Sequence, residues 1–330
     1  MIPRIAVLSL GGTIAMAAKA VSGGVTPSLT AADLVAAMPE LKPIAEIETF
    51  QISNVASPEI TLQHLVAVRD KINKLEADGF DGVVVTQGTD TIEETSWALD
   101  LMCSTRMGIV VTGAMRNPTQ AGADGPANLL ASVLVAGHPI AKDLGVLVVF
   151  NDEFHAARFV QKSHTSNVGA FTSPSCGPIG WMAEGVPIIP FQTSRTKTVK
   201  IPKNFETPWL PIIKPGLGDD GALLDAACSA GAKGIVLEAA GGGHVSEMVA
   251  ERAVAAAKEI PVILSSRTRG GSVLTQTYGF VGSETDLLSR GLISSGYLDA
   301  LKARILLLLS IVRGDGRKAL EEEFVRPDTV

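Results

Sequence analysis

The sequence predicts an α/β protein with a larger N-terminal, mostly parallel sheet flanked by helices and a smaller C-terminal α/β domain. Short apolar runs rich in β-branched residues alternate with longer segments whose apolar residues recur every three or four positions. Strands that are apolar on both faces and alternate with amphipathic helices are typical of βαβ units. The chain has 330 residues, 46% of them hydrophobic. At roughly 100–200 residues per domain, that length favours two domains with sizeable cores.

The first domain is expected over residues 1–190 and the second over residues 212–330. Residues 191–211 are polar, basic and interrupted by proline, as expected of a linker. The predicted elements of the first domain are strands 5–10, 82–86, 108–112 and 145–150, and helices 31–38, 60–77, 91–102 and 127–136. Those of the second are strands 212–214, 234–237 and 261–265, and helices 223–230, 245–258 and 296–312.

The composition narrows the class of protein. The formal net charge is −6 and no basic stripe stands out, so electrostatic binding of nucleic acid is not expected. Three scattered cysteines, Cys103, Cys176 and Cys228, do not make a disulfide framework and fit a reducing cytosol. The apolar run at 5–10 suits a buried strand better than a secretory signal, and no apolar stretch approaches the roughly 20 residues of a membrane span. We therefore expect a cytoplasmic protein.

Ligands of open α/β sheets bind outside the carboxyl ends of the strands. Functional residues are therefore expected in the turns that follow the predicted strands, and four of these turns are unusual. The first turn, residues 9–15, contains Gly11 and Gly12, which allow a close backbone approach. Thr13 follows them and could also cap a helix. The turn lacks the G-x-G-x-x-G and G-K-[ST] patterns, so nucleotide binding is not indicated.

The second turn, residues 83–95, reads VVVTQGTDTIEET. Thr91 and Glu94 have the spacing of a capping box, which explains Thr91 as the start of a helix. Thr89 and Asp90 have no such explanation. They lie beside the positive end of the predicted helix, where anionic groups bind.

The third turn, residues 110–129, has a sufficient structural interpretation. Pro126 suits the first position of a helix, and Asp124 stands near its cap. Ala114 could lend backbone groups to a neighbouring site.

The fourth turn, residues 151–171, contains Lys162 among few other charges. An exposed, solubilising lysine is the default interpretation of such a residue. His155 and His164 lack the H-E-x-x-H spacing, so a zinc site is not expected.

These turns together closely resemble the bacterial-type L-asparaginase family. The motifs agree in order and in spacing, and the resemblance covers nearly the whole chain. It implies a hydrolase that releases ammonia from the side-chain amide of L-asparagine, and in some members of L-glutamine. It also implies a homotetramer whose sites are shared between subunits. The matching segments are GGTIA (11–15), TQGTDTIEET (86–95), GAMR (113–116), ADGPANL (123–129), Lys162, SSR (265–267) and KARILLLL (302–309).

The resemblance assigns catalytic roles by motif. Thr13 would be the nucleophile, and Thr89, Asp90 and Lys162 would form a second catalytic group. A carboxamide is a poor electrophile, so its attack needs an activated hydroxyl and a stabilised oxyanion. A lysine must be neutral to act as a base. Burial favours this neutral amine, whereas a neighbouring carboxylate favours the ammonium ion, and the sequence does not decide between the two forms. This chemistry calls for no metal and no organic cofactor.

The resemblance also assigns substrate contacts. Asp90 would receive the α-amino group, Ser57 would hold the α-carboxylate, and Glu284 would reach the amino group from a neighbouring subunit. Ser57 also has a structural interpretation, because Ser57 and Pro58 suit the N-cap and first position of the helix predicted at 60–77. The other residues expected around the substrate are Gly12, Gly88, Thr89, Ala114 and His244.

Three positions depart from the family pattern. One is Pro58, which follows Ser57 where relatives commonly have glutamine. Many relatives have a lid tyrosine about twelve residues after the nucleophile, where this chain has Gly23 and Gly24. The lid can still hinge on these glycines, and we expect Thr26 to replace the missing hydroxyl. His244 stands where some relatives place asparagine or serine, and it could contact the substrate pocket or simply occupy the turn.

Three other functions compete with an L-asparagine amidohydrolase. A broader glutaminase-asparaginase, or an amidase for another small amide, is the nearest alternative, because one methylene gives only about 1–3 kcal/mol of discrimination. A non-catalytic amino-acid-binding protein would be expected to lack Thr13, Thr89, Asp90 or Lys162, and all four are present. A nucleotide-dependent oxidoreductase would need the glycine fingerprint that is missing here.

Overall fold

The computed structural model describes residues 2–12, 16–18, 25–27, 31–191, 193 and 195–325, with residues 16–18 and 25–27 described by their backbone alone. The chain divides into two compact units, Met1–Thr198 and Val199–Val330, and each is described by itself. A large, mostly parallel sheet with flanking helices in the first unit, and a smaller α/β arrangement in the second, confirm the predicted fold class.

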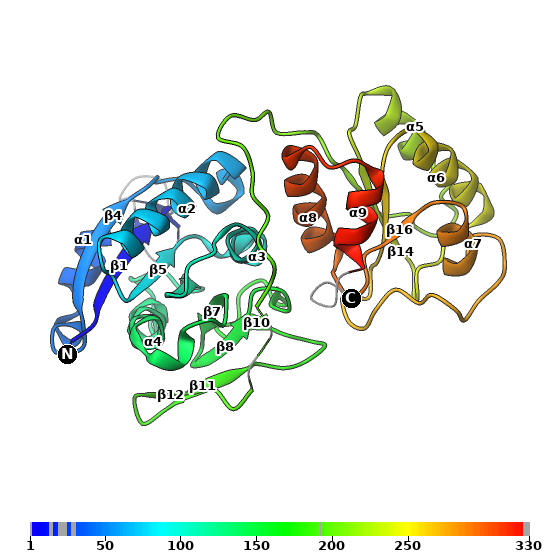
Figure 1. Cartoon of the computed structure of the whole chain (residues 1–330). Coiled ribbons are helices and arrows are strands. Elements are labelled where there is room, and N and C mark those ends of the chain that lie inside the picture. The colour runs from blue at the N-terminus through cyan, green and yellow to red at the C-terminus, as the bar shows by residue number, and fades with distance from the viewer. Residues whose placement is uncertain are drawn as a thin grey trace. The chain divides into compact units, whose positions relative to one another are not determined.

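The first unit is built on an eight-stranded sheet of order β12-β11-β8-β7-β6-β5-β1-β4 (Figure 1). Neighbours from β4 to β7 run parallel, and β8, β11 and β12 continue the sheet antiparallel. Every residue of β5, β6 and β7 is buried, which explains their continuous apolar sequences. The strands are β1 (Arg4–Ser9), β4 (Glu46–Gln51), β5 (Gly82–Thr86), β6 (Gly108–Thr112), β7 (Val146–Phe150), β8 (Glu153–Ala156), β11 (Gly180–Ala183) and β12 (Val186–Ile188).

Helices cover the two faces of this sheet. Helices α1 and α4 pack on the face that carries Ile5, Val84 and Val110, and share one apolar core with it. Helix α3 packs against β6 and β7 and against α2. The helices are α1 (Ala31–Ala36), α2 (Leu62–Ala77), α3 (Ile92–Met102) and α4 (Gly125–Gly137), with short 3₁₀ turns η2 (Pro39–Leu41), η3 (Ser57–Glu59), η4 (Thr89–Thr91) and η5 (Pro139–Ala141).

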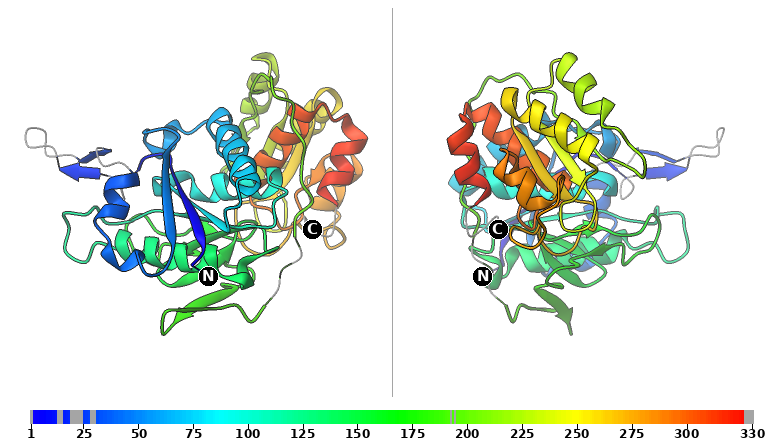
Figure 2. Two further views of the ribbon diagram at one scale, coloured as in Figure 1. Left: turned by 60° about the vertical axis from the view of Figure 1, so that its left-hand side comes forward. Right: turned by 90° about the vertical axis from the view of Figure 1, so that its right-hand side faces the viewer.

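Two small antiparallel hairpins complete the first unit. Strand β2 (Met16–Ala18) pairs with β3 (Val25–Pro27), so the first turn leads into a hairpin and not into a helix. This hairpin stands out from the sheet (Figure 2). Strand β9 (Gln161–Lys162) pairs with β10 (Phe171–Thr172), with Lys162 opposite Phe171. The fourth turn is thereby held as a hairpin.

The second unit has a four-stranded parallel sheet of order β13-β14-β15-β16. Its apolar core lies between β14, β15 and helices α5 and α6. Among the residues that the structure describes, no helix is long and apolar enough to cross a membrane. The elements are β13 (Ile212–Ile213), α5 (Ala222–Ser229), β14 (Ile235–Ala239), α6 (Glu247–Glu259), β15 (Val262–Ser266), α7 (Glu284–Ser289), β16 (Ile293–Ser294), α8 (Ala300–Arg313) and α9 (Arg317–Phe324).

Candidate active site

The first and second turns meet because β1 and β5 are parallel neighbours in register, so both leave the sheet at the same edge. Gly11 and Gly12 have φ angles of 109° and 96°, in the region that favours glycine. A Cβ atom on Gly12 would lie 1.9 Å from the backbone nitrogen of Gly88. Only glycine therefore fits at this crossing. Thr13, the predicted nucleophile, follows Gly12 directly and lies outside the described residues.

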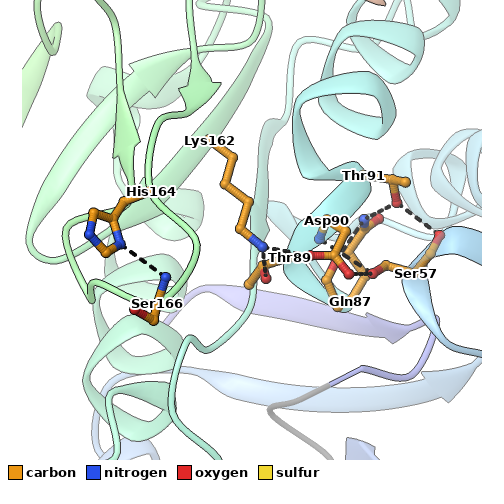
Figure 3. Close-up of polar contacts among 9 residues, drawn as sticks. Ser57, Gln87, Thr89, Asp90, Thr91, Lys162, His164 and Ser166 are labelled. Carbon is orange, nitrogen blue, oxygen red and sulfur yellow. Dashed lines mark hydrogen bonds and ion pairs between the residues drawn. The ribbon is translucent and has the colours of Figure 1, made fainter.

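Lys162 connects the fourth turn to the second (Figure 3). Its Nζ atom lies 2.8 Å from Thr89 Oγ1 and 2.6 Å from Asp90 Oδ1. The Lys162 side chain is only 15% exposed, so the default interpretation of a freely solvated lysine is wrong. One amine thus contacts both a hydroxyl and a carboxylate at the carboxyl edge of the sheet.

Asp90 is the charged partner in this group. The hydrogen bond from Lys162 lowers the pKa of Asp90, and it outweighs burial, which acts in the opposite direction. The attraction of the Lys162 charge and a hydrogen bond from Ser57 lower this pKa further. The Asp90 carboxyl is therefore ionised at neutral pH, although 60% of its side chain remains exposed to solvent.

Ser57 faces Asp90 from the connection before α2. Its Oγ lies 3.2 Å from Asp90 Oδ2, and the backbone nitrogen of Asp90 lies 3.3 Å from the same Oγ. One interpretation of the sequence was that Ser57 caps α2, and this is wrong. Thr61 is the N-cap, in a capping box with His64, and Ser57 begins the 3₁₀ turn η3. The buried Ser57 hydroxyl is thus available to the site.

Thr91 has a different role from the predicted one. It precedes α3, but its side chain makes no capping hydrogen bond, so the predicted capping box is wrong. Thr91 Oγ1 instead donates to the backbone oxygen of Ser57 at 3.0 Å and accepts from Gln87 Nε2 at 3.2 Å. Gln87 Nε2 also donates to the backbone oxygen of Gly88 at 3.1 Å.

The third turn is held by its own polar side chains. Asp124 accepts hydrogen bonds from the backbone nitrogens of Met115 and Arg116, and makes no capping bond to α4. Asn128, 2% exposed, donates to the backbone oxygen of Gly113 at 3.1 Å and to Asp124 at 3.1 Å. These contacts fix the buried turn around Ala114, the predicted backbone donor.

The remaining predicted contacts, His244 and Glu284, belong to the second unit. His244 Nε2 lies 3.0 Å from Glu284 Oε2, and Glu284 Oε1 accepts from the backbone nitrogens of Thr277 and Tyr278. Burial acts to raise the pKa of Glu284, but these backbone donors and His244 together lower it. An ionised carboxylate only accepts hydrogen bonds, so His244 Nε2 carries the shared proton.

Like Thr13, the predicted lid residues are either outside the described residues or described by their backbone alone. Gly23 and Gly24 lie outside the described residues, and Thr26 lies in β3, where only the backbone is described. The histidines of the fourth turn have local partners: His155 contacts Ser173, and His164 accepts from backbone nitrogens. Across the described part of the chain, no group of three or more His, Cys, Asp or Glu residues could hold a metal ion.

Comparison with known proteins identifies the family. Residues 4–193 match "Asparaginase, N-terminal" and residues 211–324 match "Glutaminase/Asparaginase C-terminal domain". This chain belongs to the asparaginase family. It is therefore an enzyme of the amidohydrolase class.

Similar proteins cover the asparaginase chain almost completely. It is 36% identical to "L-asparaginase 2" of Bacillus subtilis, over 98% of this chain and 86% of that protein. It is 33% identical to "L-asparaginase 2" of Escherichia coli, over 98% and 93%. A crystal structure of a probable cytoplasmic L-asparaginase from Campylobacter jejuni superposes with a TM-score of 0.88 at 33% identity, covering 98% of this chain and 99% of that one.

Sequence reasoning missed two contributors to the site of this asparaginase. Gln87 was not considered, and Thr91 was explained as a helix cap. The position of Gln87 directly after an all-buried strand, with a polar side chain where burial is expected, is the signal that could have found it.

Proposed function

We propose that this asparaginase hydrolyses the side-chain amide of L-asparagine to L-aspartate and ammonia, with Thr13 as the nucleophile. The observation that carries the proposal is the bridge from Lys162 Nζ to Thr89 Oγ1 and Asp90 Oδ1. An amine held between a hydroxyl and a carboxylate resembles a serine triad in that a charged residue orients the group that contacts the hydroxyl. The names of the similar proteins, L-asparaginases in each case, support the substrate.

In the proposed reaction the Thr13 hydroxyl attacks the amide carbon. The Thr13 proton passes to the leaving nitrogen, the C–N bond breaks, and ammonia leaves an ester on Thr13. Water then attacks that ester, restores the Thr13 hydroxyl and releases L-aspartate. Backbone N–H groups at the crossing of Gly12 and Gly88, and at Ala114, are the proposed donors to the oxyanion.

The second group has a defined electrostatic role in this proposal. The ionised Asp90 carboxylate keeps the Lys162 amine oriented, and Lys162 donates to Thr89 Oγ1. Donation to its oxygen makes the Thr89 hydroxyl a stronger proton donor. Thr89 would therefore supply protons to, and orient water for, the two half-reactions. Positioned acid–base help of this kind is worth about 10²–10⁴-fold in rate.

The same residues would orient the substrate. L-Asparagine is a zwitterion, so its ammonium would pair with Asp90 and its carboxylate with the Ser57 hydroxyl. Ser57 donates to Asp90 Oδ2 in the structure, and would turn that donation to the carboxylate when substrate binds. We expect Asp90→Ala to weaken recognition of the α-amino group as well as catalysis.

The test is ammonia release from L-asparagine and from L-glutamine by the purified protein. Thr13→Ala and Thr89→Val should keep the fold, checked by circular dichroism, and each should lower kcat by orders of magnitude. Near-normal turnover by either variant would refute the assigned roles. Equal specificity for both amides would replace L-asparagine amidohydrolase with the broader glutaminase-asparaginase.

We further propose a cytoplasmic homotetramer in which Glu284 and His244 of one subunit complete the site of another. Glu284 is fully buried in the single chain, so assembly would have to uncover one of its oxygens. Mixing Thr13→Ala subunits with Glu284→Ala subunits should restore part of the activity, whereas no recovery in fully exchanged mixtures would refute shared sites. Light scattering measures the oligomer size. Cell fractionation tests the location, because the similar proteins include a "Probable Cytoplasmic L-asparaginase" and a "Probable L-asparaginase periplasmic".

A further inference from the structure

We propose that Gln87 and Thr91 are positioning residues that clamp the backbone of Ser57 and thereby hold its hydroxyl in the substrate site. The inference rests on the proposed function, in which Ser57 binds the substrate carboxylate. It concerns residues to which the proposed function assigns no contact with the substrate. The chain of contacts runs from Gln87 through Thr91 to Ser57 (Figure 3).

The directions of these hydrogen bonds are fixed by chemistry. The backbone oxygen of Ser57 only accepts, so the single proton of Thr91 Oγ1 is donated to it. Thr91 must then accept from Gln87, and the second hydrogen of the Gln87 amide goes to the backbone oxygen of Gly88. Both protons of the Gln87 amide nitrogen are thus used, so the amide orientation is determined by its partners.

The clamp joins two segments that are distant in the sequence. Ser57 comes from the connection before α2, and Thr91 comes 34 residues later, at the start of α3. The direct contacts of Ser57 Oγ with Asp90, at 3.2 and 3.3 Å, are at the long end for hydrogen bonds. The 3.0 Å anchor on the Ser57 carbonyl is therefore the shorter of these links, and it is independent of the hydroxyl that would bind substrate.

The environment of the Gln87 side chain indicates that it positions Thr91 and does not add to the stability of the fold. This side chain is fully buried, yet its Oε1 has no hydrogen-bond partner among the residues that the structure describes. A buried acceptor without a partner is destabilising. An apolar side chain of similar size would avoid that cost but could not hold Thr91. The amide is thus retained at a position where it reaches both Thr91 and Gly88.

The experiment measures KM and kcat for L-asparagine in Thr91→Val, Thr91→Ser and Gln87→Met. Thr91→Val removes the hydroxyl at nearly constant volume, and we expect KM to rise about tenfold, the order of one misplaced hydrogen bond to a charged group. kcat at saturation should change less than threefold, because Thr89, Asp90 and Lys162 keep their contacts. Thr91→Ser should restore KM to near the wild-type value. Gln87→Met should raise KM in the same direction.

Thr95→Val is the matched control. Thr95 lies one turn further along α3, and its buried hydroxyl has no hydrogen-bond partner in the described part of the chain. Its removal should leave KM and kcat unchanged. A purely structural role for Thr91 would lower the melting temperature of Thr91→Val without raising KM.

Two failures can be told apart. A wild-type chain that releases no ammonia from L-asparagine would overturn the proposed function and this inference with it. An active wild-type chain whose Thr91→Val variant keeps a normal KM would overturn the clamp alone. If Thr91→Val does not fold, Gln87→Met decides: a normal KM in that folded variant refutes the clamp, and a raised KM supports it.

Discussion

His155 links the stability of the first unit to pH. Its side chain is 1% exposed in β8, and its Nδ1 lies 2.9 Å from Ser173 Oγ. Within the described residues, its Nε2 has no hydrogen-bond partner. Burial lowers the pKa of His155 to about 4. Burial outweighs the half-exposed carboxylate of Glu153, whose Oε2 lies 3.6 Å from Nε2. The ring is therefore neutral in the folded protein at neutral pH.

The magnitude follows from linkage between protonation and folding. In the unfolded chain the ring takes up a proton near the ordinary pKa of 6.5, whereas in the folded chain it does so near 4. Each pKa unit of difference is worth about 1.4 kcal/mol, so the full effect is about 3 kcal/mol. Because the unfolded state binds more protons between these values, the free energy of unfolding falls as the pH falls. About 2 kcal/mol of it should be lost between pH 8 and pH 5.

The perturbation that isolates this effect is His155→Asn, which keeps a donor toward Ser173 and cannot titrate. Urea unfolding of both proteins, followed by circular dichroism from pH 8 to pH 5, gives the difference in stability at each pH. Taking the difference cancels the other titrating groups, which are common to the two proteins. The variant starts less stable at pH 8, and we expect this gap to shrink by about 2 kcal/mol at pH 5.

Parallel loss of stability in the two proteins would refute the reasoning, since it would mean that the folded ring binds protons as readily as the unfolded one. Glu153→Gln is a useful companion variant. It removes a carboxylate whose charge favours the protonated ring but leaves the burial, so the pH effect should persist or increase. Loss of the effect in Glu153→Gln would contradict burial as the cause of the lowered pKa.

Three further predictions concern the site itself. Gly12→Ala should abolish ammonia release or soluble expression, because its Cβ would collide with the Gly88 nitrogen at 1.9 Å. Asn128→Leu leaves the buried partners of the amide unpaired, and thermal unfolding should show a loss of about 1–3 kcal/mol. Lys162→Met should lower kcat by about 10²–10⁴-fold. Lys162 lowers the pKa of Asp90, so the variant should raise it. Ammonia release from L-asparagine at neutral pH measures the loss of kcat.

The parts of the fold that the sequence predicted well are those buried on both sides. Strands β5 and β6 were predicted with their observed bounds because every position is apolar or small and inaccessible. Strand β4, EIETFQ, was missed because it is a half-exposed edge strand with charged residues at alternate positions. Its pairing with β1 depends on a neighbour more than 40 residues away, which no local pattern records.

For the site residues, too, the local sequence was not sufficient. Resemblance to the asparaginase family gave Thr89, Asp90 and Lys162, and the structure brings these three together. From the residues alone, Lys162 had only the features of a solvated lysine. Its partners lie 72 and 73 residues earlier in the chain. Such a contact exists only after the sheet has placed the second and fourth turns at one edge.

Helix capping was the local rule that gave wrong predictions at this site, and the two errors have one cause. Ser57 and Thr91 both stand where a hydroxyl would cap a helix, and neither does so. Helix α2 is capped by Thr61 instead, and α3 is preceded by the 3₁₀ turn η4, whose backbone supplies the first turn. A helix that can begin without a given hydroxyl leaves that hydroxyl available for a contact across the sheet edge. Here the Thr91 hydroxyl donates to the backbone oxygen of Ser57, and the Ser57 hydroxyl donates to Asp90.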